Sequence, residues 1–438
     1  MSVDTTYPLN PRSTLHALKP YGVGSPEVES LLSYFCRLAV SHSMSVASLA
    51  LTVADALRSE LRDGFEWHER NLSGMGESAQ TWASGLSALT SMGNLHHLTL
   101  VGWRDVLAQS GLAATGNGRW CPQCLEEDRL QGRSPYFRLS WDIGAVTACS
   151  WHGIKLVDVC PDCGRTRVRH KAAYVVPGWC THCGAFFGAC SRKDVPSIAA
   201  SPQELWVARQ VEALLTAQPA LEQPAQHTGL RDAIREVVLR MDGGKAAAFA
   251  KRIGVSKGTV HYWVHGNTIP TLKACLRICA CSGLSLLKLL TGDLEGWNVP
   301  QEPSQLNFGF EGVKKREAPR TLDWEAIREE LTRYAKQFTP ISVAEAARRL
   351  QVDTRHLYLQ ANNEARVLGE RWKAYLKRRG EDSYAKARPH VEAAYRALRE
   401  QGSGISLRQV QERIPPEILA SVERLFDMLQ EIQTELEE

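Results

Sequence analysis

The sequence predicts a mainly α-helical, multidomain protein. An N-terminal helical or α+β domain with tandem structural zinc fingers is expected first, and helix-turn-helix domains follow it. Three observations support this fold class. Apolar residues recur at helical spacing in several segments, four pairs of metal-ligating residues crowd into one short segment, and two segments in the second half resemble two helices joined by a tight turn. The length of 438 residues, 44% of them hydrophobic, suits several globular domains.

Charge and composition restrict the compartment more than the function. The net charge is only +4, so a nucleic-acid partner has to be argued from local patches. The N-terminus, MSVDTTYPLNPRS, has no basic segment followed by an apolar core, and no window approaches ~18 uninterrupted apolar residues. We therefore expect no signal peptide, no membrane span and a cytoplasmic location. In a reducing cytosol the twelve cysteines are better explained as metal ligands or buried thiols than as disulfides.

The first predicted domain, residues 1–118, begins with a Pro-rich extended arm over residues 1–20. Residues 25–57 have the pattern of helix, short turn and helix, with Ser25 as the expected N-cap. A further helical pattern covers residues 88–107. It includes His96 and His97, which have no ligand partners at matching spacing and are expected to be surface or core side chains.

Four pairs of metal-capable residues define the second domain, residues 119–190. Each pair has two residues between its members, a spacing that lets a tight turn present both side chains to one tetrahedral ion. The pairs are Cys121 and Cys124, Cys149 and His152, Cys160 and Cys163, and Cys180 and Cys183. Eight ligands predict two structural Zn²⁺ ions, one in a Cys₃His site and one in a Cys₄ site.

A redox centre or a catalytic zinc site is a weaker interpretation of the four pairs. A redox motif needs one Cys-x-x-Cys, and a catalytic zinc needs an open coordination position. Sequential pairing of the ligands places residues 121, 124, 149 and 152 in site 1 and residues 160, 163, 180 and 183 in site 2; a cross-braced arrangement is the alternative. We favour sequential pairing because each site then closes one compact loop.

The remaining aromatic and thiol side chains of this part have simpler interpretations. Residues 136–149 alternate enough to predict a strand that leads into the second ligand pair. Tryptophans around the zinc segment are expected to fill its core, namely Trp120, Trp141, Trp151 and Trp179. Cysteines outside the pairs are expected to be buried thiols, namely Cys36, Cys275, Cys279 and Cys281. Cys190 is a less favoured spare ligand.

Three runs together resemble the TniQ/TnsD family of transposition target selectors. They are ESLLSYFCRLA, then LTLVGW, then RWCPQCLEEDR…PYFRLSWDIGAVTACSWHGIKLVDVCPDCG, within roughly residues 20–190. The resemblance implies a protein of bacterial transposons that marks target DNA and recruits a separate AAA+ ATPase, which then engages the transposase. In some family elements the target is a fixed DNA site. In others the protein is carried by a CRISPR Cascade complex with its guide RNA.

The second half begins with a helix and linker, residues 191–229, and a helix-turn-helix domain, residues 230–297. Ala250 is small where the two helices meet, Gly254 permits a positive φ in the turn, and Ser256 can cap the second helix. Val260 and Trp263 fall on the inward face of this helix. The outward side chains are candidate DNA contacts, namely Lys257, Thr259, His261 and Tyr262. The same fold also makes dimer contacts, so base reading is one of two interpretations.

After a linker at residues 298–320, residues 321–438 form the expected C-terminal helical domain. Residues 338–366 have a second helix-turn-helix pattern in which Gln351 stands where a turn glycine is usual, so a strained turn is expected. Arg355 and His356 are its candidate DNA contacts. A third, fainter unit covers residues 402–419. The acidic tail, EIQTELEE, is expected to be solvated.

The run RWKAYLKRRG, residues 371–380, has five basic residues and no acid. One interpretation is a solvated helix end, and the other is a phosphate-contacting patch beside a helix-turn-helix. The candidate phosphate contacts are Arg371, Lys373, Lys377, Arg378 and Arg379.

These features predict a targeting adaptor whose partners are an AAA+ transposition ATPase and double-stranded DNA. The DNA is marked directly or through a Cascade complex. The alternative is a zinc-containing helix-turn-helix transcription regulator. No G-x-x-x-x-G-K-[ST] phosphate loop and no H-E-x-x-H motif occurs in the sequence, so we expect no enzymatic activity. Helix-turn-helix proteins often dimerise, which makes a homodimer a further expectation that the sequence alone does not decide.

Overall fold

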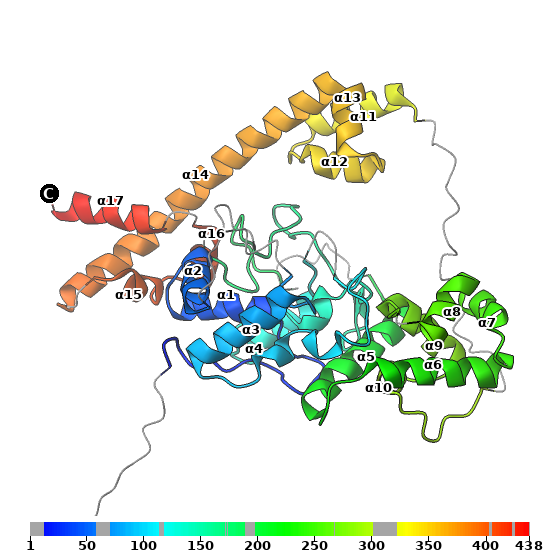
Figure 1. The fold of residues 1–438 in the computed structure, drawn as a ribbon. Helices are drawn as coiled ribbons and strands as arrows, with labels where there is room; N and C mark the ends of the chain where they lie inside the picture. The colour runs from blue at the N-terminus through cyan, green and yellow to red at the C-terminus, as the bar shows by residue number, and fades with distance from the viewer. Residues whose placement is uncertain are drawn as a thin grey trace, which may run out of the picture. The chain divides into compact units, whose positions relative to one another are not determined.

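The structure is a computed structural model, and it describes most of the chain (Figure 1). The described residues are 13–57, 71–113, 118–170, 172, 174–188, 198–266, 268–300, 322–402, 405–422 and 425–437. They form two compact units. Unit 1 consists of Met1–Pro161, Arg165–Thr181 and Phe186–Val313, and unit 2 consists of Asp162–Gly164, His182–Ala185 and Lys314–Glu438. The expected linker at 298–320 lies almost wholly outside the described residues, as does Cys190.

The first helix, α1 (Leu31–Ser41), begins later than the sequence pattern predicts. Its N-cap is Ser30, whose side chain accepts a hydrogen bond from the Ser33 amide. Ser25, the predicted cap, lies instead in a turn, where its hydroxyl donates to the Gly22 carbonyl at 2.8 Å. The reason is a tertiary contact, because backbone hydrogen bonds join residues 28–30 to residues 137–139 and keep residues 28–30 extended.

Unit 1 continues with short helices around one two-stranded sheet. Strand β1 (Ala148–Cys149) pairs antiparallel with β2 (Ile154–Lys155). The predicted strand over 136–149 is therefore wrong for most of its length, because Leu139–Asp142 forms a 3₁₀ turn. The other elements up to this point are α2 (Val46–Ala56), α3 (Glu77–Thr90), η2 (Leu95–Leu98), η3 (Val101–Trp103), α4 (Pro122–Leu130) and η4 (Leu139–Asp142).

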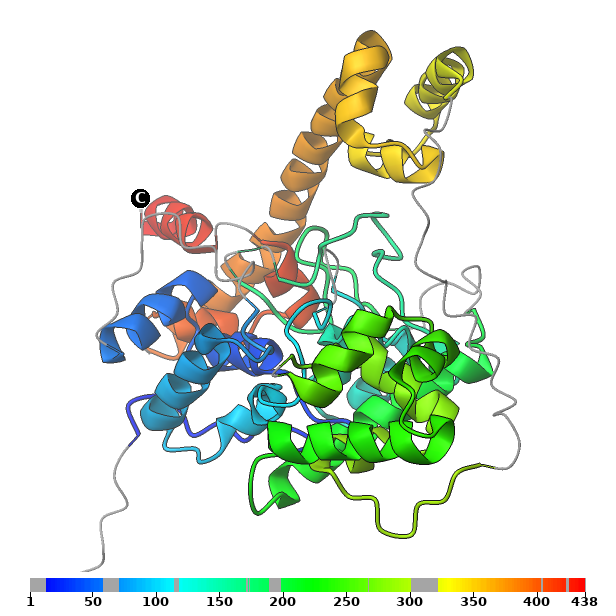
Figure 2. The same cartoon turned by 45° about the vertical axis from the view of Figure 1, so that its right-hand side comes forward.

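The second part of unit 1 is a run of helices that Figures 1 and 2 show grouped together in green. They are α5 (Pro202–Ala217), η6 (Gln218–Ala220), α6 (His227–Asp242), α7 (Ala246–Ile253), α8 (Lys257–His265), α9 (Leu272–Ser282) and α10 (Leu286–Thr291). One hydrophobic core runs from Leu15 to Trp297 through these helices and through α1–α3. The N-terminal helices and the helix-turn-helix thus share a single core.

Helices α7 and α8 form the predicted helix-turn-helix. Gly254 ends α7 in the left-handed conformation, with φ of 68°. The Ser256 side chain caps α8 by accepting from the Thr259 amide at 3.1 Å. Val260 and Trp263 are buried, as the spacing predicted. The guanidinium of Arg277, on α9, donates to the Gly254 carbonyl at 3.0 Å and so holds the turn from behind.

Among the described helices, no single one is long and apolar enough to cross a membrane. Helices α1 and α2 pass that test only as a pair, and the chain bends by 105° between them.

Unit 2 begins with the second helix-turn-helix. Helices α11 (Trp324–Lys336), α12 (Val343–Leu350) and α13 (Thr354–Gln360) pack on the start of α14 (Asn362–Glu400) around a small core. Ala347, Val352 and Leu357 are buried there. Gln351 has φ of 54°. A residue other than glycine therefore adopts the left-handed conformation in this turn, which is the strained turn that the sequence predicts.

Helix α14 has 39 residues and links two ends of unit 2 (Figure 2, orange). Its far end packs against α15 (Leu407–Gln411), α16 (Pro416–Ser421) and α17 (Leu425–Glu437). The faint third repeat is thus a pair of very short helices with Pro415 as the cap of the second. The expectation of a solvated acidic tail holds for most of its described residues, since Glu431 and Glu435 are exposed, but the tail lies in α17 and its Ile432 is buried.

Two glycines of the first helix-turn-helix should respond to alanine in opposite directions. In Gly254→Ala the new Cβ meets only ordinary contacts, the nearest atom being Arg277 Nη1 at 3.8 Å, but the left-handed backbone is strained. We expect a loss of about 1 kcal/mol in unfolding free energy. In Gly258→Ala, inside α8, the nearest atom is Ser256 Oγ at 3.8 Å, and we expect a gain of about 0.5–1 kcal/mol. Urea denaturation followed by circular dichroism measures both; equal stability of the two variants would contradict the assigned turn.

Candidate metal centres and nucleic-acid interface

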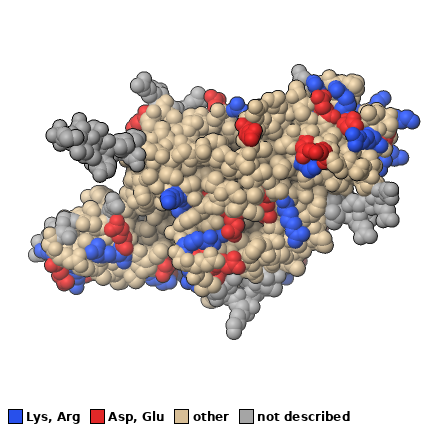
Figure 3. Space-filling view, turned by 90° about the horizontal axis from the view of Figure 1, so that it is seen from below, with Lys and Arg blue, Asp and Glu red and all other residues tan. Residues whose placement is uncertain are grey.

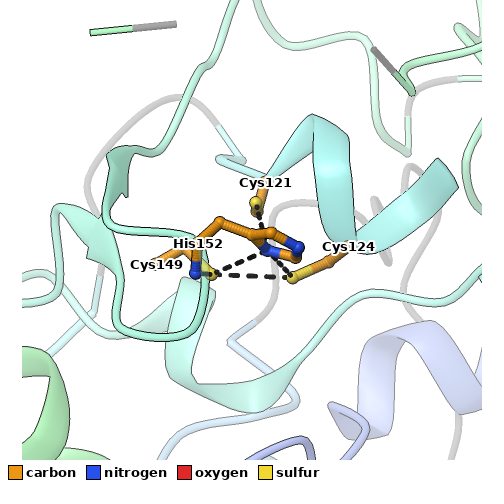
Figure 4. A group of neighbouring side chains, drawn as sticks. All are labelled: Cys121, Cys124, Cys149 and His152. Atoms are coloured by element: carbon orange, nitrogen blue, oxygen red, sulfur yellow. Dashed lines mark hydrogen bonds between the residues drawn. The ribbon is translucent and has the colours of Figure 1, made fainter. Parts of the chain in front are cut away.

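The first metal centre brings together the side chains of Cys121, Cys124, Cys149 and His152 (Figure 4). The His152 Nδ1 atom lies 3.5, 3.3 and 3.5 Å from the three sulfurs, in that order. The Cys124 and Cys149 sulfurs are 3.6 Å apart. A tetrahedron with Zn–S bonds of about 2.3 Å has edges of about 3.8 Å. The four ligand atoms therefore fit one tetrahedral zinc ion with no position left open.

Two local structures present these ligands. Cys121 is the N-cap of α4, Pro122 is its first residue, and Cys124 follows in the first turn. The amide hydrogens at a helix N-terminus favour the negative charge of thiolates. Cys149 ends β1, and His152 lies in the turn before β2, where Gly153 has φ of 66°. Each ligand pair is thus held by a turn that needs few residues, which explains why its spacing is visible in the sequence.

A carboxylate outside the ligand set orients the imidazole. Glu127 Oε1 lies 2.9 Å from His152 Nε2, while Nδ1 faces the sulfurs. In this arrangement Nε2 carries the proton and donates a hydrogen bond to Glu127, which leaves the Nδ1 lone pair for the metal. Burial lowers the pKa of His152, but its hydrogen bonds to Glu127 and Cys149 outweigh that effect and raise the pKa. Sequence reasoning missed Glu127, although its position three residues after Cys124 places it on the same side of α4.

The charge of the thiols also calls for a metal. Hydrogen bonds with the Cys121 and Cys149 sulfurs, together with burial, raise the pKa of Cys124. Three thiolates this close repel one another, so they ionise together only around a cation. A divalent ion removes this conflict and releases the thiol protons on binding.

The second metal centre has four cysteines, namely Cys160, Cys163, Cys180 and Cys183. Their sulfurs all lie within 4.8 Å of one another. Gly164 and Gly184 follow two of the ligands in left-handed conformations, with φ of 65° and 70°. The two centres are those of sequential pairing, and the protein supplies four ligands to each. This donor set is that of structural zinc.

The zinc segment is tied to α1 by buried charges. Arg138 is 2% exposed and donates to Asp128, at the end of α4, with an Nη2–Oδ1 distance of 2.9 Å. Its guanidinium lies 4.0 Å from the ring centre of Tyr136. Glu29, which precedes α1, pairs with Arg37 at 2.7 Å. Backbone hydrogen bonds join residues 28–30 to residues 137–139. The Glu29–Arg37 and Arg138–Asp128 ion pairs therefore lie on two segments that are hydrogen-bonded to each other.

The tryptophan prediction holds for three residues of four. Trp120, Trp141 and Trp179 are buried, and Trp120 stacks on Phe187 with ring centres 4.1 Å apart. Trp151 is 78% exposed, because it lies in the turn between two zinc ligands. Of the predicted buried thiols, Cys36, Cys275 and Cys279 are buried, whereas Cys281 is half-buried.

The predicted DNA contacts of α8 are mostly accessible. Lys257, His261 and Tyr262 are exposed, and Tyr262 exposes 60% of its surface. Thr259 is half-buried, and its hydroxyl lies 2.7 Å from Ser256 Oγ in the cap of the helix. The exposed His265 lies beside His261, with ring centres 4.7 Å apart, and sequence reasoning missed it. Its spacing of four residues from His261 was the available signal.

In unit 2 the predicted contacts divide between two helices and several directions. Arg355 and His356 are exposed on α13, whereas the five basic residues of 371–380 lie on α14. Lys373 is exposed and pairs with Glu370 at 2.8 Å, and Lys377 and Arg378 are exposed.

Besides Lys373, two of the five basic residues have partners within unit 2. Arg371 donates to the Gln337 carbonyl. Arg379 donates to Tyr375 Oη at 2.8 Å and pairs with Asp162. The RWKAYLKRRG run therefore does not present all its charges on one face. On the face in Figure 3, blue and red atoms also occur together in small groups.

His96 and His97 lie beside a surface pocket of about 420 Å³, which Gln80, Arg104 and Asp105 also line. Burial lowers the pKa of both histidines. Within the described part of the chain, neither belongs to a group of metal-ligating side chains.

A comparison with models of protein families matches part of the chain. Residues 20–156 match the model of the family described as TniQ. The matched range contains α1–α4, both strands and all four ligands of the first metal centre. No curated protein matches the chain.

Removing the carboxylate beside His152 should weaken one zinc site and spare the other. For Glu127→Ala we expect zinc affinity at the first centre to fall about 10-fold to 100-fold, because the imidazole loses its hydrogen-bond acceptor. Elemental analysis of the unmodified chain should find two zinc ions, and competition with a chromogenic chelator measures their affinities. The second centre is the internal control; an unchanged competition curve for both ions would contradict the role given to Glu127.

Proposed function

We infer that the chain is a TniQ/TnsD family protein, because residues 20–156 match the model of the TniQ family. From this premise we propose that it is a targeting adaptor, which marks the DNA that a transposon will enter and recruits an AAA+ regulator ATPase to it. The family match carries the proposal, since it connects the chain with transposition. The two zinc centres support an adaptor, because their four-ligand sites hold surfaces in place and leave no coordination position for a substrate.

Direct contact with double-stranded DNA is the first part of the proposal. Helix α8 has the capped, glycine-turned geometry of a recognition helix and exposes Lys257, His261 and Tyr262. His and Lys donate hydrogen bonds to base edges or phosphates, and Tyr adds a contact surface. The shared core of unit 1 supports a rigid connection between this helix and the TniQ domain. DNA position would then set the position of the domain.

Recruitment of an ATPase is the second part. The sequence has no phosphate loop of the G-x-x-x-x-G-K-[ST] type, so nucleotide hydrolysis has to come from a partner. The helical region of the TniQ domain is the surface we propose for this partner, because the family match extends over it. The two modes of targeting differ in their partners. A chain that reads a DNA site itself binds the duplex directly, whereas a guided chain binds a Cascade complex with its guide RNA.

The experiment that tests the adaptor function is a pull-down with the tagged full chain. We expect it to retain an AAA+ ATPase encoded beside it, and more of that ATPase when duplex target DNA is added. Retention of Cascade subunits with guide RNA would identify guided targeting. Promoter binding with a change in expression, and no ATPase, would favour the alternative of a transcription regulator.

Substitutions on α8 should reduce DNA affinity without unfolding the domain. For His261→Ala and Tyr262→Ala together we expect at least a 10-fold loss of affinity for the target duplex, since one good base contact is worth about 1–3 kcal/mol. Fluorescence anisotropy measures the affinity. Lys273→Ala, at an exposed position of α9, is the control and should bind normally. Equal affinities of the double variant and the control would remove α8 from the interface.

A further inference from the structure

One stripe of α14 carries four basic side chains and one tyrosine along much of its length. Arg366, Lys373, Lys377, Tyr384 and Arg388 follow one another at steps of seven, four, seven and four residues. At 3.6 residues per turn these positions fall within a band about 60° wide and about 33 Å long. Arg366, Lys373 and Lys377 are exposed.

The helix around this stripe packs little of its surface. Between Leu368 and Ala387, both buried, every residue of α14 is half-buried or exposed. A helical stretch that buries no apolar stripe is held by its ends and offers its sides to solvent or to a partner. The stripe also contains acids, since Glu370 pairs with Lys373 at 2.8 Å and Glu381 is exposed at its edge.

Helix α17 covers the far end of the stripe with carboxylates. Leu425, Met428 and Ile432 of α17 are buried. From the edge of this apolar face Glu431 accepts a hydrogen bond from Tyr384, and Glu435 accepts one from Arg388.

The Arg388 guanidinium is shared between two carboxylates. Its second nitrogen lies 3.9 Å from Glu431, and the helix is held separately by Arg399, which donates to the Leu436 carbonyl at 3.0 Å. The side chains are 33% exposed for Arg388 and 54% and 59% exposed for Glu431 and Glu435.

We propose that this stripe is a surface for the sugar-phosphate backbone of duplex DNA, and that Glu431 and Glu435 occupy its Arg388 end until DNA replaces them. The inference rests on the proposed function, in which the chain contacts DNA. Two carboxylates on an arginine offer the same charge-assisted hydrogen bonds as backbone phosphates.

The exchange needs only side-chain motion. An ion pair as exposed as this one contributes little to stability, so a phosphate can displace it. The apolar face of α17 can stay packed while Glu431 and Glu435 turn to solvent. Arg388 then joins Arg366, Lys373 and Lys377 as a fourth cation on the stripe.

The test compares two double variants of the full chain. Glu431→Gln with Glu435→Gln frees Arg388 but keeps the shape of both side chains. The matched control is Glu392→Gln with Glu400→Gln, which changes the net charge equally and frees Arg396, paired with Glu392 at 2.5 Å but off the stripe. Binding of a 30-base-pair duplex of arbitrary sequence is followed by fluorescence anisotropy over a range of salt concentrations.

We expect the first double variant to bind roughly fivefold to tenfold more tightly at 0.1 M salt, with a salt slope steeper by about 0.9, because one more phosphate is neutralised. The control should show a smaller gain and an unchanged slope. Adding Arg388→Gln to the first variant should remove its gain, whereas Arg388→Gln alone should change little. Lys373→Gln with Lys377→Gln should reduce the salt slope by the equivalent of about two phosphate contacts.

Three contrary results would overturn different parts of the proposal. Equal gains in both double variants would show an effect of net charge and overturn the role of α17. An unchanged affinity and salt slope after substitution of Lys373 and Lys377 would overturn the stripe as a DNA surface. No duplex binding by any folded variant, with the ATPase still retained in the pull-down, would overturn direct DNA contact while leaving the adaptor function standing.

Discussion

The fold of unit 1 depends on the nine-residue helix α4 and on the metal at its start. A helix this short is marginal in water by itself, and here its first turn carries two zinc ligands while its second turn holds Glu127 and Asp128. Glu127 orients the imidazole of His152, and Asp128 neutralises the buried Arg138. The metal therefore fixes more than its own loop. The segment that it positions also forms the backbone hydrogen bonds that keep residues 28–30 extended and set the start of α1.

The features that could be predicted from the sequence are those whose geometry is local. A ligand pair with two intervening residues closes within one turn, so the spacing predicted the eight ligands of both zinc sites. The spacing left a cross-braced arrangement open, and the structure groups the ligands in the sequential pairing that we favoured. The helix-turn-helix could be predicted in the same way. The backbone of Gly254 forms the turn, and the hydroxyl of Ser256 caps the second helix. Gln351 shows the limit of this logic, since the tertiary core holds a turn that its own residue disfavours.

The features that could not be predicted depend on contacts distant in sequence. Ser25 and Ser30 are equally good caps by composition, and the pairing with residues 137–139 chooses between them. Tryptophan is usually a buried residue, but Trp151 lies in the turn between the zinc ligands Cys149 and His152 and points outward. The acidic tail looked solvated because its apolar positions, such as Ile432, find their partner only in α14. Likewise, the basic run of 371–380 divides among several directions once it lies on one helix.

Helix α14 also acts as a spacer with a fixed pitch. Its 39 residues extend about 58 Å, and a long section of it is held by hydrogen bonds along the chain more than by packing. Length and rotation are therefore coupled between the helix-turn-helix at one end and the small helices at the other. One inserted residue would shift one end by about 1.5 Å and turn it by about 100°, whereas seven would nearly restore its orientation. Relatives with a different spacing between these parts should therefore differ by whole turns of helix.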